Sequence, residues 1–386
     1  MKKVKNTGAV ICMLLLAACQ KDARVAEQTN ELTSTAARNT SASASLNENT
    51  SGYVYTLNNQ VSGNKVMVYN RGTNGNLSFD AAYATGGNGS GGGLGNQDAI
   101  NLGDDDILLA VNAGSNSISS LQVNSGSLSW KSTVSSGGMR PVSITRYQDK
   151  VFVLNAGGDG NISGFTLNND GTLTAIPNST KPLSAAGVAP AEIAFINEGK
   201  VVVVTERASN KIISYTVNEM GMPQMMHSLI SVNPTPFGFA VGNNGNIFVS
   251  EAVGGAAGAS TLSSYHIGFD GAISLVDGPV GANQSAACWV VITNNGKYAY
   301  TTNTANNNLS TFGINNAGAI NVNTAIAGIT QAGPIDAALT GNSKFLYVLN
   351  GGSHSISAFA VANDGGLTSI QTSTGLPVGA NGLAAK

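Results

Sequence analysis

Val151-Phe152-Val153-Leu154-Asn155 is followed by Asn161-Ile162-Ser163-Gly164-Phe165-Thr166-Leu167 and then by Asp170-Gly171-Thr172-Leu173. The first run is apolar, the second alternates with period two, and Asp-Gly is typical of a tight turn. The same phrase recurs about every fifty residues, which is the length of one four-stranded propeller blade. The other first runs end at Asn58, Asn112, Glu206, Glu251, Asn303 and Asn350. Seven copies predict an all-β, seven-bladed propeller of four-stranded antiparallel blades.

The composition agrees with a radial β-repeat. The chain has 386 residues, 48 of them glycine, and only 10% are charged. No long segment has the 3.6-residue period of a helix, and a ring can grow by adding blades without needing a second core. The net charge is −2 and Lys and Arg form no dense cluster, so a nucleic-acid partner is not expected. We predict a monomeric propeller.

The two ends of the repeat predict how the ring closes. Full blades begin with a Gly/Pro-rich approach and an innermost strand, as in Arg140-Pro141-Val142-Ser143-Ile144. The first blade lacks this strand, because Tyr53-Val54-Tyr55-Thr56 comes directly after a polar segment. Residues 378–385 resemble an innermost strand with nothing after it. The C-terminal strand is therefore expected to complete the first blade and to pair its open edge.

The N-terminus has the features of a bacterial lipoprotein signal. Lys2, Lys3 and Lys5 precede a short apolar core, and Leu16-Ala17-Ala18-Cys19 looks like a lipobox. We expect residues 1–18 to be removed, Cys19 to be lipidated, residues 19–51 to form a disordered tether, and residues 52–386 to form the propeller. This organisation predicts a lipid-anchored envelope protein, at the outer membrane and facing the periplasm or the surface, whose only membrane contact is its anchor.

Two positions break the repeat at the end of the second strand. Five blades have Asn there, whereas two neighbouring blades have Glu206 and Glu251, and Arg207 follows the first. Because the blades are adjacent, the two carboxylates are expected on adjacent sectors of the channel rim. One interpretation gives these three residues catalytic roles, with a glutamate activating water and an arginine pairing with a substrate carboxylate. The other is that Glu caps the following turn as Asn does.

Acidic residues also recur on the predicted innermost strands. Counting back fourteen residues from four of the second-strand ends gives Asp98, Glu192, Trp289 and Asp336, and Arg140 precedes another innermost strand. We predict that these five residues line a ligand-binding channel mouth. Clustered carboxylates can hold a divalent cation, bind a cationic or polyhydroxylated ligand, or keep one acid protonated. They can equally bond strand-end amides around a water-filled channel. The sequence does not decide whether a metal is bound.

One histidine joins this predicted mouth. His354 lies in the turn Gly351-Gly352-Ser353-His354-Ser355, on the rim that carries the acids, so we include it among the ligand-binding candidates. The other two histidines, His227 and His266, fall in strand-like runs.

The repeats Tyr-Val-Leu-Asn, Ser-Ile-Ser-x-Phe and Asp-Gly-x-Leu resemble those of the lactonase-like seven-bladed propellers, a group that includes 6-phosphogluconolactonase and the carboxymuconate-lactonising enzymes. The resemblance covers about residues 52–386. It is closer to an extracytoplasmic branch through residues 204–207, 250–260 and 284–291. The resemblance implies the propeller fold and a lactonase-type activity. Catalytic members have a histidine near the start of an innermost strand, and this sequence has none there.

Two functions follow from these features. The first is hydrolysis or isomerisation of a lactone or sugar-acid substrate at the acidic channel mouth. The second is a non-catalytic surface module that binds a glycan, peptide or protein. Whether the protein is an enzyme is left open by the sequence, because a fold does not determine a function.

Overall fold

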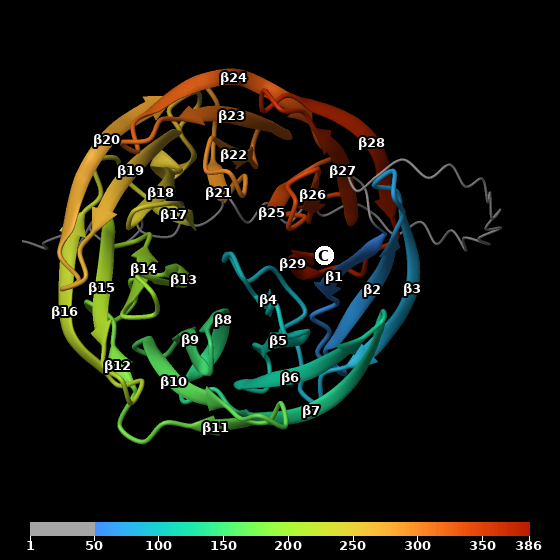
Figure 1. Cartoon of the computed structure of the whole chain (residues 1–386), viewed down its shortest axis with the longest axis vertical. Coiled ribbons are helices and arrows are strands. Elements are labelled where there is room, and N and C mark those ends of the chain that lie inside the picture. Colours follow the sequence, from blue (N-terminus) through green and yellow to red (C-terminus); the bar gives the residue numbers. More distant parts are fainter. Residues whose placement is uncertain (1–50) are drawn as a thin grey trace, which may run out of the picture.

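The computed structural model describes residues 51–386, which form a closed ring of seven β-sheets around a central axis (Figure 1). We number the sheets as blades 1 to 7 in the order of their second strands along the chain. Blade 1 is β29 (Asn381–Ala385), β1 (Gly52–Leu57), β2 (Lys65–Arg71) and β3 (Leu77–Ala84). Blade 2 is β4 (Ile100–Leu102), β5 (Ile107–Asn112), β6 (Ser117–Asn124) and β7 (Ser127–Ser135). Blade 3 is β8 (Met139–Tyr147), β9 (Lys150–Gly157), β10 (Asn161–Leu167), β11 (Leu173–Ala175) and β12 (Lys181–Pro182).

The other four blades repeat this pattern. Blade 4 is β13 (Pro190–Ile196), β14 (Val201–Glu206), β15 (Lys211–Val217) and β16 (Pro223–Ile230). Blade 5 is β17 (Pro236–Val241), β18 (Asn246–Glu251), β19 (Thr261–Ile267) and β20 (Ile273–Gly281), with a 3-10 turn η1 (Val253–Gly255). Blade 6 is β21 (Ala287–Ile292), β22 (Tyr298–Asn303), β23 (Asn308–Ile314) and β24 (Ile320–Ile329). Blade 7 is β25 (Pro334–Leu339), β26 (Phe345–Asn350), β27 (Ser355–Val361) and β28 (Leu367–Thr374). The predicted seven-bladed fold is confirmed.

The ring closes between its first and last strands. β29 pairs antiparallel with β1, so that Leu383 lies opposite Thr56. Beyond the strand end, the backbones of Tyr53 and Lys386 exchange hydrogen bonds of 2.9 and 2.8 Å. Both segments lie side by side in Figure 1, blue against red. The C-terminal strand therefore supplies the innermost strand of blade 1, as predicted.

The core lies between neighbouring blades. Because each blade packs against another on both faces, second strands such as Val151–Leu154 and Val201–Val204 are fully buried on both sides. Phe152 of blade 3 meets Phe195 of blade 4 edge to face, with ring centroids 5.5 Å apart. Each buried side chain of this size contributes about 1.5–3 kcal/mol, so the ring is a stiff support for whatever its loops carry.

A left-handed glycine joins the third and fourth strands of every blade. Gly171, from the predicted Asp-Gly turn, has a φ of +84°. In blade 1 the equivalent Gly75 packs against Phe345 of blade 7, and an added Cβ would lie 2.5 Å from that ring. Glycine is required there both by the backbone conformation and by the close approach of the neighbouring blade.

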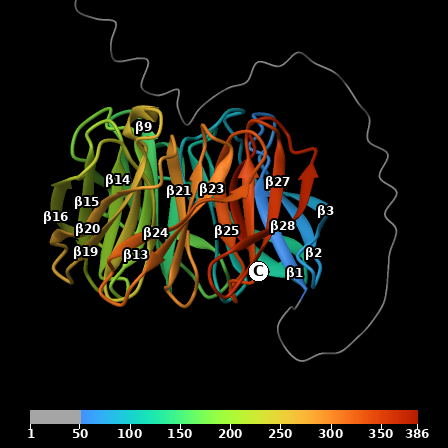
Figure 2. The same cartoon turned by 90° about the horizontal axis from the view of Figure 1, so that it is seen from above.

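The ring has two distinct faces, visible when it is turned on edge (Figure 2). Since strands alternate in direction, innermost strands begin and second strands end on one side, which we call the mouth face. The turns that join first to second strands lie on the other side, the far face. Within the described residues, no helix is long and apolar enough to cross a membrane.

Candidate active site at the mouth of the central channel

The innermost strands are distorted close to where they begin. In blades 4, 6 and 7 the register of the ladder shifts just before Glu192, Trp289 and Asp336. A β-bulge changes the direction of the side chain that follows it. The three predicted residues therefore share one position in three blades.

Three of the predicted acids come together in the channel. Glu192 and Asp336 are each only 1% exposed, and Asp98 is half-buried. Burial raises the pKa of Asp98 to about 7. Burial, followed by the charge of Asp98, holds the pKa of Glu192 and that of Asp336 well above their usual ranges. Backbone N–H donors oppose these shifts without cancelling them. Burial therefore favours the protonated forms of the carboxyls in this part of the channel.

Both fully buried acids also have a structural partner. The Oε2 atom of Glu192 accepts a 2.6 Å hydrogen bond from the backbone N–H of Phe239 in the next blade, and Oδ1 of Asp336 accepts one from Ala337. Oδ2 of Asp336 is buried and has no hydrogen-bond partner within 3.5 Å among residues 51–386. The predicted alternative, in which acids satisfy strand-end amides, therefore accounts for part of the arrangement.

The segment that precedes β4 crosses the channel. The backbone N–H of Gln97 donates to the carbonyl of Ala191 in blade 4, and its side chain makes two hydrogen bonds to the backbone of Val290 in blade 6. The two neighbours of Gln97 in sequence both bind blade 3. Asn96 donates to the carbonyl of Val142, and the carbonyl of Asp98 accepts from the backbone N–H of Ile144. The segment holds Asp98 in place and links blades 4 and 6 inside the ring. In Figure 1 it lies close to the ring axis.

Two arginines lie above this segment on the mouth face. Arg207 is half-buried, its guanidinium stacks 4.5 Å from the centre of the Phe237 ring, and its Nε donates to the carbonyl of Ala189. Burial, then the nearby charge of Arg140, lowers the pKa of Arg207 to about 10. Arg140 is exposed and donates to the carbonyl of Gly93. Neither arginine forms a salt bridge within the described part of the chain.

Glu206 and Glu251 lie elsewhere, inside the blades. Both are fully buried. Oε2 of Glu251 accepts from Ser263 in the third strand of its own blade, at 2.7 Å, and Oε1 accepts from Ser231 at the end of the preceding blade, also at 2.7 Å. Glu206 likewise accepts from the hydroxyls of Ser184 and Ser209. The structure does not bring these carboxylates to the channel acids.

An asparagine at the equivalent position makes the same connections. The Nδ2 of Asn112 donates to Ser119 in the third strand, and its Oδ1 accepts from Thr85 of the preceding blade. Glu251 joins the same two blades, but it accepts a hydrogen bond from the third-strand hydroxyl of Ser263, whereas Asn112 donates to the hydroxyl of Ser119. This geometry matches the capping interpretation of the two glutamates.

The remaining two candidates have different environments. His354 has a φ of +51°, and its carbonyl accepts from Leu376, just as Asn116 and Asn210 accept from the end of the fourth strand in other blades. His354 thus occupies the left-handed turn position of the repeat. Trp289 is buried against Phe237, ring centroids 4.7 Å apart, and its Nε1 has no partner among the described residues.

Two residues of this site were not predicted from the sequence. Gln97 acts through a contact across the ring, which no local pattern reveals. Phe237, in Thr235-Pro236-Phe237, follows the same proline that marks other innermost strands, and an aromatic residue there could have been noticed. Within residues 51–386, no group of three or more His, Cys, Asp or Glu side chains is arranged to hold a metal ion.

The comparisons with known proteins agree with this fold. The family model described as "Lactonase, 7-bladed beta-propeller" matches residues 261–380, which confirms the predicted resemblance to lactonase-like propellers. No curated protein sequence matches the chain.

Solved structures match over most of the ring. A Bacteroides fragilis protein proposed to be a 6-phosphogluconolactonase is 16% identical, with a TM-score of 0.66 over 87% of this chain and 98% of the other. A periplasmic gluconolactonase of Pseudomonas aeruginosa is 14% identical, with a TM-score of 0.66 over 86% of this chain and 99% of the other. At such identities the likeness establishes the fold, and an activity has to be argued from the site.

Proposed function

We propose that this protein hydrolyses a lactone of the sugar-acid type at the mouth of its channel. One observation carries the proposal: Arg140 is close enough to lower the pKa of Arg207, yet neither arginine is paired with a carboxylate in residues 51–386. Bringing two unpaired cations together, one of them half-buried, is unfavourable unless an anion binds between them. A lactone supplies that anion twice, as the oxyanion of the transition state and as the product carboxylate.

A proton acceptor on the same stretch of blade 4 supports the proposal. The carbonyl of Ala189, just before β13, accepts from Arg207, and that of Ala191, within β13, accepts from Gln97. Asp98 is the next residue after Gln97 and is therefore held on the same part of blade 4 as Arg207. With a pKa of about 7, both its protonated and ionised forms are populated at neutral pH, as general acid–base catalysis requires.

The proposed reaction uses these groups in sequence. Ionised Asp98 removes a proton from water as its oxygen attacks the lactone carbonyl carbon, and the arginines stabilise the resulting oxyanion. The ring C–O bond then breaks, and the leaving alkoxide takes the proton from Asp98. The product is a hydroxy acid, which releases its carboxyl proton to solvent, and the resulting carboxylate pairs with Arg207. We assign proton transfer to Asp98 because hydrogen-bond donors already engage both oxygens of Glu206 and of Glu251.

The test is turnover of δ-gluconolactone, measured as acid released above the spontaneous rate. Arg207→Gln should lower kcat/KM by about 10²-fold or more, the cost typical of a lost oxyanion donor, and Arg207→Lys should restore part of it. Asp98→Asn should lower kcat by about 10²-fold or more. Matched controls are Lys65→Gln and Asp80→Asn, both exposed and far from the channel.

A non-catalytic module that binds a glycan, peptide or protein is the second candidate, and the Gln97 segment favours it because its bonds to blades 4 and 6 occupy the inside of the ring. Saturable binding of gluconate that depends on Arg207, without turnover of δ-gluconolactone or other lactones, would establish this second function. Absence of both turnover and binding would overturn the proposal.

The proposal includes the place of action. Cys19 and residues 1–50 lie outside the described residues, so anchoring rests on the lipobox alone. We propose that the propeller acts as a lipid-anchored monomer in the bacterial envelope, at the outer membrane. A phosphorylated cytosolic substrate does not fit that location.

A further inference from the structure

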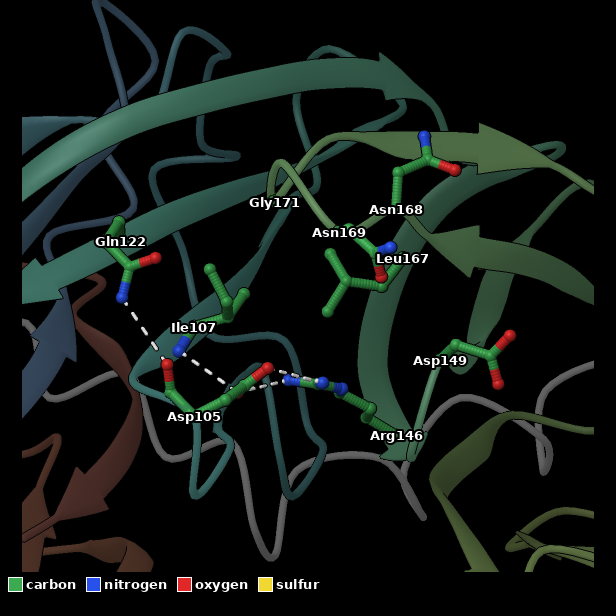
Figure 3. Close-up of a pocket in the computed structure, with 9 residues that line it drawn as sticks. All are labelled: Asp105, Ile107, Gln122, Arg146, Asp149, Leu167, Asn168, Asn169 and Gly171. Carbon is green, nitrogen blue, oxygen red and sulfur yellow. Dashed lines mark hydrogen bonds and ion pairs between the residues drawn. The ribbon is translucent and has the colours of Figure 1, made fainter.

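A cavity opens on the far face, between blades 2 and 3 (Figure 3). Its volume is about 380 Å³, within the range of small-molecule sites. The cavity is separate from Arg140 and Arg207, which lie on the mouth face. Its lining residues are Asp105, Ile107, Gln122, Arg146, Asp149, Leu167, Asn168, Asn169 and Gly171.

One wall of the cavity is fixed by an ion pair between the blades. Arg146 of blade 3 binds both carboxylate oxygens of Asp105 in blade 2, at 2.6 and 2.7 Å, and its Nε donates to the carbonyl of Gln148. The planar, bidentate contact fixes the orientation of both side chains. It also neutralises both charges, so the wall attracts neither anions nor cations strongly.

The rest of the cavity is rich in unused hydrogen-bond acceptors. Gln122 donates its amide to the carbonyls of Asp105 and Asp106, which leaves its Oε1 without a partner among residues 51–386. Asn168 donates to two threonine hydroxyls, and its Oδ1 has no partner in the same part of the chain. Within residues 51–386, the side chains of Asp149 and Asn169 make no hydrogen bond. Four polar groups with available acceptors therefore border the cavity.

An apolar floor lies between the two polar sides. In Figure 3 Ile107 and Leu167 lie between the side chains of Asp105 and Gln122 and those of Asn168, Asn169 and Asp149. Ile107 and Leu167 are each 5% exposed. A ligand that fits has a C–H surface for the floor and several hydroxyl donors around its rim.

The equivalent crevice between blades 4 and 5 provides an internal comparison. There the backbone N–H of Ile267 donates to the carbonyl of Gly245, just as that of Leu167 donates to Asp149. By this alignment Gly245 replaces Asp149, and Phe269, which is 60% exposed, replaces Asn169. That crevice thus offers an aromatic ring and no carboxylate at these two positions, so the blade geometry alone does not dictate the polar lining.

We propose that the cavity between blades 2 and 3 is a second ligand site, which binds a neutral sugar ring. The acceptor-rich rim matches ring hydroxyls, the floor matches the C–H face, and the pairing of Arg146 with Asp105 leaves no free cation in the lining to bind an anionic ligand. The site is independent of the proposed lactonase activity. A glycan held there leaves the mouth face open.

The test is ligand-observed NMR titration of the full chain with methyl α-D-glucopyranoside, methyl β-D-galactopyranoside and methyl α-D-mannopyranoside. At least one probe should show saturable, millimolar binding, as expected for a single sugar ring in a shallow site. Asn169→Phe, which introduces the residue found at the same place in blade 5, should weaken binding at least tenfold. Asp149→Asn should weaken it severalfold. Arg207→Gln and Asp80→Asn should leave it unchanged.

The melting temperature of each variant shows whether the ring is intact. Absence of saturable binding for all three glycosides would overturn the inference. So would binding that survives Asn169→Phe in a folded ring, or a site that takes n-butylammonium and no glycoside. Loss of glycoside binding in Arg207→Gln would place the sugar at the mouth face instead and would equally overturn it.

Discussion

Glu251→Gln distinguishes a catalytic glutamate from one that joins blades. The carboxylate accepts five hydrogen bonds: from Ser231, Tyr265 and the backbone of Asn233 at Oε1, and from Thr261 and Ser263 at Oε2. Glutamine keeps the shape and one oxygen, but presents an NH2 group to two hydroxyls that now donate. Those two hydroxyls must rotate so that they accept hydrogen bonds from the new NH2 group, as the Ser119 hydroxyl accepts from the amide of Asn112.

The magnitude follows from the kind of bond that is lost. A hydrogen bond to a charged group contributes about 1.5–3 kcal/mol and a neutral one about 0.5–1.5 kcal/mol. The five bonds share one charge, and removing that charge also removes the cost of burying it. We therefore expect a net loss of about 2 kcal/mol in the free energy of unfolding, or about 4 °C in Tm. Glu251→Ala leaves five donors without acceptor and should cost more than about 4 kcal/mol.

The assay pairs thermal unfolding with δ-gluconolactone turnover on the same preparations. Glu219→Gln, at an exposed turn, is the matched control and should change neither quantity. Activity of Glu251→Gln below its melting transition should stay within about twofold of the parent. A variant with an unchanged Tm and a tenfold or greater loss of turnover would refute the blade-joining role and restore the catalytic one.

Two further predictions concern charge and location. The pKa of Asp98 is about 7 in the folded ring and 3.8 when the side chain is unburied. The contribution of Asp98 to stability is therefore fully present below pH 3.8, declines as the pH rises, and is lost above about pH 7. Thermal unfolding from pH 4 to 8 should show the free energy of unfolding falling by up to about 4 kcal/mol through this group. Asp98→Asn should make the free energy of unfolding less dependent on pH. A parent protein whose stability rises with pH over this range would contradict the prediction. For anchoring, Cys19→Ala should abolish acyl labelling and membrane partition, and equal labelling of mutant and parent would disprove lipidation.

The repeat was readable from the sequence because it is local. Asp170-Gly171 demands a left-handed turn wherever it occurs, and the alternation of Asn161–Leu167 specifies which side chains enter the core. Ring closure was also predictable, since an unpaired first strand and a surplus last strand leave one solution. The register of Glu192 and Asp336 followed from counting within the repeat.

The grouping at the channel could not be read in the same way. Glu206 and Glu251 break the pattern as conspicuously as the inner acids do, and only the positions of the hydroxyl groups within their own blades distinguish the two sets. Gln97 binds Val290 in blade 6, far from it in sequence. Arg207 was predicted as a site residue, but its stacking on the Phe237 ring was not. That contact depends on the distance between blades 4 and 5, which the sequence does not give.

Comparison of the innermost strands gives a physical reason to look for chemistry at the acids. Ser143 of blade 3 follows a bulge, and its hydroxyl accepts from the N–H of Ile193 in the next blade. Glu192 follows the equivalent bulge and accepts from Phe239 in the same way. A serine thus satisfies the amide without an ionisable group, whereas a buried carboxyl incurs a desolvation cost that raises its pKa. Hydrogen bonding alone therefore does not explain an acid at this position. An acid is expected there if, as we propose, Asp98 exchanges a proton near neutral pH, because the raised pKa of Glu192 limits the negative charge beside Asp98.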